Sequence, residues 1–264
     1  MKTLHVAIAM LAAGFALSAE AVGRLADLSI FDRSTGRELP VHWHEGRPYV
    51  VGKPGNEYQV VVRNRTGEDL LAVISVDGVN VVSGETAHAQ QAGYVLDGRR
   101  EARIAGWRKS LSETSAFYFT SLPDSYAGRT GRPNNVGVIG VAVFQRKAPP
   151  PKLSMQMPHE PWLKDKAESY SESASGSAAA PPSAAHDSAS LKRIQPGSPL
   201  GTGHGRREAS QVQQVGFERR THEPVETLAI YYDSYRNLVA QGVLQTPRAL
   251  RSPDPFPSRF APDP

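Results

Sequence analysis

The chain has 264 residues and no cysteine, which excludes disulfides, thiolate metal sites and cysteine nucleophiles. Its 30 Lys and Arg residues are nearly balanced by 26 Asp and Glu residues, for a formal net charge of +4. This mild, mixed basicity gives no support for nucleic-acid binding, which depends on clustered Lys and Arg. Stability must therefore come from the apolar core alone.

Residues 1–21 have the pattern of a secretory signal peptide. Lys2 precedes an apolar stretch at 6–17, and Ala19-Glu20-Ala21 places small residues at the two positions that a signal peptidase reads. The stretch is too short to span a bilayer comfortably, and no other segment approaches about 20 apolar residues. We therefore expect export to the periplasm or outer envelope, cleavage after Ala21 and no transmembrane span.

Between residues 24 and 147 the chain contains short runs of β-branched and aromatic residues, separated by Gly, Asn, Asp or Pro. This pattern is typical of strands. The runs are YQVVVRN (58–64), DLLAVISV (69–76), VNVVSG (79–84), SAFYFTSL (115–122) and NVGVIGVAVF (135–144). Their length and spacing favour an all-β fold, an antiparallel β-sandwich.

Two turn signals and one strand refine this expectation. Asp77-Gly78 lies between two apolar runs and predicts a two-residue hairpin turn, and Asp97-Gly98 repeats the arrangement after GYVL. The run at 137–144 is apolar on both of its faces, which predicts a central strand covered on each side. Trp107 is expected in the core.

The composition changes after residue 147. Residues 148–200 are rich in Ser, Ala and Pro and poor in aromatics, which predicts a disordered linker. The Pro-rich residues 247–264 are likewise predicted to be a disordered tail. Limited proteolysis of such segments is expected to precede cleavage of the folded parts.

Residues 201–246 are predicted to form a β-hairpin followed by a short helix. The strands are expected at 211–220 and 226–234, and the second places Leu228, Ile230 and Tyr232 on one face. Asp233 or Ser234 would cap the helix, in which Tyr235, Leu238 and Val239 would share a face, and Gly242 would end it. About 40 residues are too few to fold alone without disulfides or metal, so this segment should pack on the sandwich.

Several strings resemble, in order, a family of uncharacterised exported proteins of Gram-negative bacteria. They are SVDGVNV, GYVL, GWRKS and NVGVIGVAVF, followed by LGTGHGRRE and YYDSYRNLVAQGV. The resemblance spans about residues 45–146 and 200–244. It implies bacterial export and suggests that the C-terminal segment belongs with the sandwich. It carries no known function, ligand or catalytic residue.

Two histidines are candidate metal ligands. His42 and His44 in VHWHE would project from one face of a strand, with Glu45 close by. A metal site needs a third ligand. His88, His204 and His222 are candidates only if the fold brings them close to His42 and His44. We expect surface histidines on an edge strand instead, with Trp43 between them facing the core.

Two segments are candidate contact surfaces. The connection at 124–135 is long for a hairpin and has side chains suited to polar recognition: Tyr126, Arg129, Arg132 and Asn134. GTGHGRRE (201–208) places His204 and Arg206 near three glycines, which could cradle an anion. The alternative interpretation, which the glycines favour, is a flexible return from linker to strand.

No residue set in the sequence forms a convincing active site. We therefore favour a non-enzymatic exported protein that uses the sandwich to bind an envelope protein or glycan, without a cofactor. Two alternatives remain: a metal-dependent or hydrolytic enzyme that uses the histidines, and a purely structural spacer. Convergence of three or more histidines in one pocket would favour the enzyme.

Overall fold

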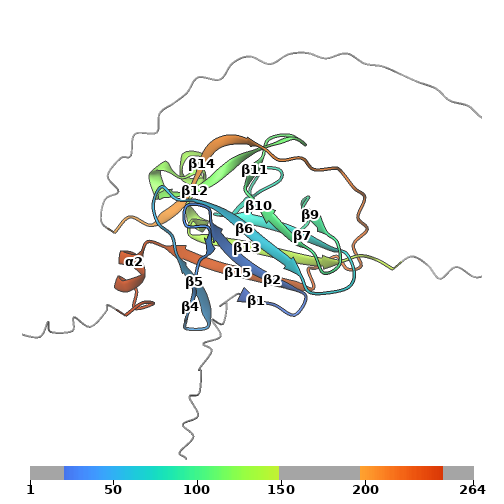
Figure 1. Ribbon diagram of the computed structural model, residues 1–264, viewed down its shortest axis with the longest axis horizontal. Helices are drawn as coiled ribbons and strands as arrows, with labels where there is room; N and C mark the ends of the chain where they lie inside the picture. The colour runs from blue at the N-terminus through green and yellow to red at the C-terminus, as the bar shows by residue number, and fades with distance from the viewer. Residues whose placement is uncertain (1–20, 149–196, 246–264) are drawn as a thin grey trace, which may run out of the picture. The chain divides into compact units, whose positions relative to one another are not determined.

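The computed structural model describes residues 21–148 and 197–245. Within them the chain forms two sheets that pack face to face, and Figure 1 shows their strands lying one layer over the other. The predicted all-β sandwich is confirmed. The predicted signal peptide up to residue 20, most of the predicted linker and the predicted tail lie outside the described residues.

The first sheet is antiparallel throughout. Its main path runs through β1 (Ala21–Val22), β2 (Ala26–Asp32), β6 (Glu57–Asn64), β12 (Glu113–Ser121) and β11 (Gly106–Arg108). Three further strands pair beside this path: β3 (Arg37–Glu38) on β2, β10 (Glu101–Ile104) on β6 and β14 (Leu200–Ala209) on β12. The β12–β14 pairing brings the C-terminal part of the chain into this sheet.

The second sheet is mixed. Its order is β4 (Val41–His44), β5 (Arg47–Val51), β15 (Glu226–Asp233), β13 (Val138–Gln145), β7 (Leu70–Val76) and β8 (Val79–Asn80), with β9 (Tyr94–Leu96) also on β7. Only the β5–β15 pair is parallel. β13 lies between β7 and β15 at the centre, as its apolar sequence predicts.

The described helices are short and lie at the ends of strands. They are η1 (Leu122–Asp124), α1 (Tyr126–Arg129), η2 (Pro133–Asn135) and α2 (Tyr235–Ala240). The hydroxyl of Ser234, one of the two predicted caps, caps α2 by accepting from the backbone N–H of Asn237, and Gly242 adopts φ 77° just beyond its end, as predicted. No helix in the described ranges is long and apolar enough to cross a membrane.

The core fills the space between the two sheets. Tyr58 stacks on Phe117 and Phe119 in the first sheet, and Ile139 and Ile230 face them from the second. A smaller cluster on the outer face of the second sheet consists of Leu71, Val73 and Phe144, against which Phe217 packs. The predicted cover on both faces of β13 is therefore confirmed.

One of the two turn predictions is right. Asp77 and Gly78 adopt φ 53° and 72° and connect the antiparallel pair β7–β8, although β8 ends at Asn80 instead of continuing to residue 84. Asp97-Gly98 does not form a hairpin, because β9 joins the second sheet and β10 the first. Only Arg99 has a positive φ there, which suits a crossing between sheets.

The predicted C-terminal hairpin is wrong in its pairing. Residues 211–220 form no strand and instead pass over the outer face of the second sheet, where the Arg219 guanidinium lies 4.2 Å from the ring centroid of Phe144. β15 fills the position between β13 and β5, because its apolar face of Leu228, Ile230 and Tyr232 is needed in the main core. In the helix, Leu238 is buried but Tyr235 is exposed.

Two further predictions are corrected. Trp43 does not face the core but is 58% exposed, on β4 at the edge of the second sheet, where only β5 pairs with it. GTGHGRRE is neither a flexible return nor a loop around an anion, since it forms most of β14. Its glycines serve packing: a Cβ added to Gly203 would lie 2.1 Å from the Tyr118 ring.

Candidate functional site

A buried hydrogen-bonded network joins the two sheets. The hydroxyl of Tyr232 donates to Asp77 Oδ1 (2.5 Å) and lies 2.7 Å from Thr202 Oγ1, which is 2.6 Å from the Tyr58 hydroxyl. The backbone N–H groups of Thr202 and Gly137 also donate to the Asp77 carboxyl group, at 2.7 and 2.9 Å. Every oxygen in the network thus has a partner, which satisfies groups that water cannot reach.

Burial dominates the titration of this network. It raises the pKa of Asp77 from 3.8 to about 6, against the opposing effect of the donors from Tyr232, Thr202 and Gly137. Burial and the neighbouring Asp77 also raise the pKa of both Tyr58 and Tyr232 well above the usual value, so their hydroxyls stay protonated. The oxygens of the network are buried and hydrogen-bonded to one another, so the network positions the strands.

Asp77 is expected to dominate the pH dependence of stability between pH 4 and pH 7. Its pKa is higher in the folded state, so its protonation stabilises the fold fully below 3.8, and this contribution is lost as the pH rises through about 6. The difference corresponds to about 3 kcal/mol of unfolding free energy. Urea unfolding of the wild type and Asp77→Asn across this range measures it.

Asp77→Asn is the matched variant because asparagine tolerates positive φ and does not titrate. Glu57 and Glu101 have lowered pKa values and oppose the trend in acid, but they are common to both proteins. The difference in unfolding free energy between the two proteins therefore isolates Asp77. Parallel pH profiles would contradict the prediction.

The site that reaches the surface is an aromatic cluster formed by Trp107, Tyr126 and His204. The ring centroids of Tyr126 and His204 are 5.4 Å apart, and those of Trp107 and Tyr126 are 4.7 Å apart. Trp107 is buried, as predicted, and its indole N–H has no acceptor among the described residues. Tyr126 and His204 are half-buried, so part of each residue is exposed to solvent.

The orientation of His204 is set by a serine. Ser115 Oγ donates to the backbone carbonyl of Gly205 (2.7 Å) and lies 3.0 Å from His204 Nδ1. Because its one hydroxyl proton is used in the hydrogen bond to Gly205, Ser115 can only accept from Nδ1, so His204 does not act as a base toward it. Ser115 is also fully buried and out of reach of a substrate. Nε2 of the neutral ring is left as an acceptor.

Basic side chains surround this cluster. Burial, and then the charges of Lys109, Arg129 and Arg207, lower the pKa of His204. Arg207 lies 3.6 Å from Glu113, whereas Lys109 and Arg129 are exposed and make no ion pair within the described residues. We call Lys109, Arg129 and Arg207 the rim cations. They give the cluster a positive border.

The structure brings together only part of the predicted contact surface. Tyr126, Arg129 and His204 meet at the aromatic cluster. Arg132 stacks over Tyr126, but its guanidinium donates to the Gly84 carbonyl and so fastens the segment 124–135 to a neighbouring turn. Asn134 is exposed in η2. Arg206 does not belong to the aromatic cluster.

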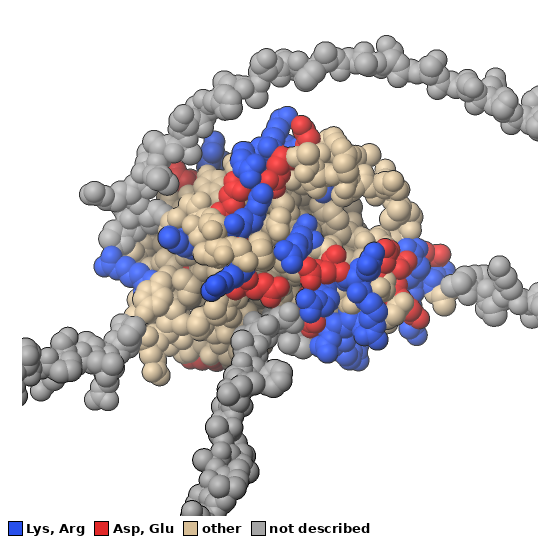
Figure 2. Space-filling view, viewed as in Figure 1, with Lys and Arg blue, Asp and Glu red and all other residues tan. Residues whose placement is uncertain are grey.

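Arg206 belongs to an ion-pair network on the surface. It forms two hydrogen bonds with the Glu57 carboxylate, at 2.9 and 3.0 Å, and lies 3.4 Å from Glu208. The hydrogen bond from Arg206 lowers the pKa of Glu57. Figure 2 shows Lys and Arg side chains interleaved with Asp and Glu on the face in view. The predicted contact residues did not include Lys109, although its position two residues after Trp107 was an available signal.

The histidines named as metal candidates do not converge. His42 and His44 share the outer face of β4, as predicted, and His44 lies beside Tyr49. His204 is in the aromatic cluster, while His88 and His222 lie near Gln90 on another part of the surface. In the described ranges no three His, Cys, Asp or Glu residues are grouped so as to hold a metal ion.

Comparisons with protein-family models, with curated proteins and with solved structures find no match. The function must therefore be argued from the residues themselves.

Proposed function

We propose that the protein is a non-enzymatic binding protein, exported to the periplasm or outer envelope of a Gram-negative bacterium, whose aromatic cluster and rim cations contact an envelope protein or glycan that carries negative charge. The N-terminal sequence pattern supports the export. The observation that supports the binding is the meeting of two half-buried rings, Tyr126 and His204, with two cations that have no described ion-pair partner, Lys109 and Arg129.

Each element of the cluster contributes a different part of such recognition. Tyrosine and histidine rings supply contact area at a small cost in side-chain entropy, and their polar edges form hydrogen bonds. Unpaired Lys and Arg attract an anionic group and fix its orientation. The catalytic alternative has less support, because Ser115 is buried and its hydroxyl proton is committed to Gly205.

The test compares retention of the mature protein on sedimented cell envelopes. Removing the charges with the double variant Lys109→Ala, Arg129→Ala should weaken binding about 5-fold to 30-fold, if each exposed charge contributes about 0.5–1 kcal/mol. Retention of the wild type should also fall as salt is added, because exposed charges are screened.

The matched control removes two exposed arginines outside the cluster. Arg37→Ala, Arg100→Ala changes the net charge equally, at positions on β3 and before β10. Its binding should equal that of the wild type, and all variants should keep the wild-type melting temperature. Equal losses in both double variants would mean that binding follows net charge, which would overturn the assignment of the site.

A further inference from the structure

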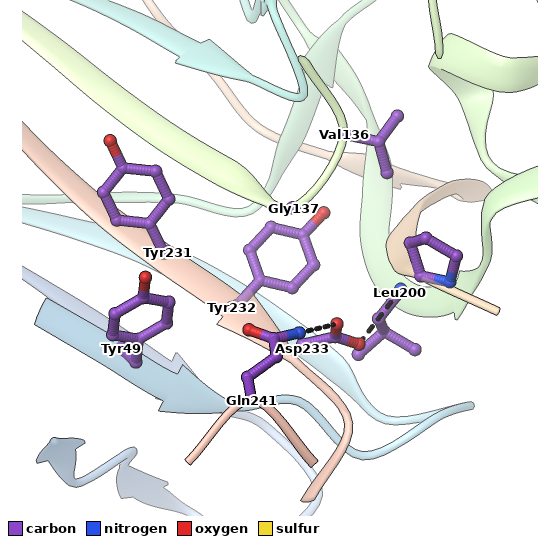
Figure 3. Close-up of a pocket in the computed structure, with 9 residues that line it drawn as sticks. Tyr49, Val136, Gly137, Leu200, Tyr231, Tyr232, Asp233 and Gln241 are labelled. Carbon is purple, nitrogen blue, oxygen red and sulfur yellow. Dashed lines mark hydrogen bonds between the residues drawn. The ribbon is translucent and has the colours of Figure 1, made fainter. Parts of the chain in front are cut away.

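A second site lies away from the aromatic cluster. It is a pocket of about 200 Å³ where the ends of β5 and β15, the start of β14 and the end of α2 meet. The lining combines aromatic, aliphatic and carboxylate groups (Figure 3): Tyr49, Val136, Gly137, Pro199, Leu200, Tyr231, Tyr232, Asp233 and Gln241.

The charge in this pocket comes from Asp233, which is only 9% exposed. Its Oδ1 accepts from the backbone N–H groups of Leu200 (3.2 Å) and Ser234 (2.7 Å) and from Asn237 Nδ2 (2.8 Å). Its Oδ2 accepts only from Gln241 Nε2, at 3.1 Å. All four donors are neutral, and Asp233 forms no ion pair within the described residues. A largely buried carboxylate therefore lacks a countercharge.

Two tyrosines form the opposite wall. Tyr49 and Tyr231 are paired in the parallel register of β5 and β15, and their ring centroids are 5.5 Å apart. Figure 3 shows the two rings side by side, with the Gln241 amide turned toward Asp233. The Arg47 guanidinium lies 5.6 Å from the Tyr231 centroid. This wall thus already attracts a cation through its ring faces.

We propose that this pocket binds a primary ammonium group on a short aliphatic chain, with Asp233 as its counterion and Tyr49 and Tyr231 as its aromatic wall. An ammonium group has three donors, and Asp233 Oδ2 and the Gln241 amide oxygen are acceptors with capacity left. The pocket volume suits a few methylene groups. The ammonium group comes either from a free diamine or from a lysine side chain of a peptide.

Calorimetric titration of the full mature protein tests the charge requirement. The probe is 1,5-diaminopentane, and its neutral isostere 1,5-pentanediol is the control ligand. The diamine should bind and the diol should bind at least about 10-fold more weakly, because a hydrogen bond to a charged group is the stronger one. Equal binding of the two probes, or binding of neither, would overturn the proposal.

Variants locate the binding. Asp233→Asn should weaken diamine binding at least about 10-fold, and Tyr49→Ala, which leaves the α2 contacts intact, should weaken it about 3-fold or more. Tyr49→Ala keeps the test decisive if Asp233→Asn fails to fold. Tyr235→Ala, an exposed tyrosine on α2 outside the pocket lining, is the matched control and should bind like the wild type.

Arg47 tests whether the ammonium group binds beside the tyrosine wall. Arg47→Ala should tighten diamine binding about 2-fold to 5-fold by removing a competing positive charge near Tyr231. A weaker affinity in Arg47→Ala would contradict this placement of the ammonium group. The diamine and Nα-acetyl-lysine methylamide both carry the required ammonium group. Tighter binding of the lysine derivative would indicate a lysine side chain as the ligand, and tighter binding of the diamine would indicate a free diamine.

Discussion

Replacing Asp77 with alanine is expected to lower the free energy of unfolding by about 3–5 kcal/mol. Three buried donors lose their acceptor at once: the N–H groups of Gly137 and Thr202 and the Tyr232 hydroxyl. Alanine at φ 53° also adds backbone strain. The loss is a large share of a typical stability of about 5–15 kcal/mol. Urea unfolding monitored by circular dichroism measures it.

The second Asp-Gly sequence provides the control. Asp97 is exposed, precedes Gly98 and has no side-chain hydrogen bond within the described ranges. Asp97→Ala should therefore change stability by less than about 0.5 kcal/mol. If the two aspartates gave equally small losses, the network between Tyr58, Thr202, Tyr232 and Asp77 would not be what joins the two sheets.

Replacing Ile139 with alanine is expected to cost about 2–5 kcal/mol. Ile139 is fully buried in β13, paired with β7 on one side and β15 on the other. The surrounding strands are held by their ladders, so they cannot collapse into the cavity that the lost methyl and methylene groups leave. Unfolding in guanidinium chloride measures the change.

Graded controls separate the core from the proposed contact surface. Ile139→Val should cost about 0.5–1.5 kcal/mol, and Arg129→Ala, at an exposed position in α1, less than about 0.5 kcal/mol. Greater damage from Arg129→Ala than from Ile139→Ala would show that the segment 124–135 holds the fold together instead of presenting a surface.

Three residues of the proposed contact surface, Tyr126, Arg129 and His204, were predictable from the sequence, but their assembly was not. Tyr126 and His204 were each identified from side-chain chemistry in a segment rich in Gly, Arg or Asn. Their ring contact depends on the pairing of β12 with β14, between residues about 80 to 95 positions apart in the chain. The same pairing turned Arg206 toward Glu57, which spacing within one segment could not indicate.

The pocket at Asp233 shows more clearly what could not be predicted from the sequence. Asp233 was identified only as a possible helix cap, and Tyr49 and Tyr231 were not identified as site residues. They meet because β5 and β15 pair in parallel, which requires a long crossover connection and leaves no local signal. A sequence pattern of period two indicates which residues share a face, but not which strand lies alongside.

The sequence by itself determined the class of fold, the central place of β13, the tight turn at Asp77-Gly78 and a cap of α2 at Asp233 or Ser234. These follow from side-chain periodicity, positive-φ tolerance and local hydrogen bonding, all of which act within a few residues. Only the tertiary structure decided which sheet β9, β10, β14 and β15 join, and that 211–220 covers an outer face. Those choices depend on burying apolar faces from distant segments together. The free energy gained by this burial cannot be inferred from any single segment.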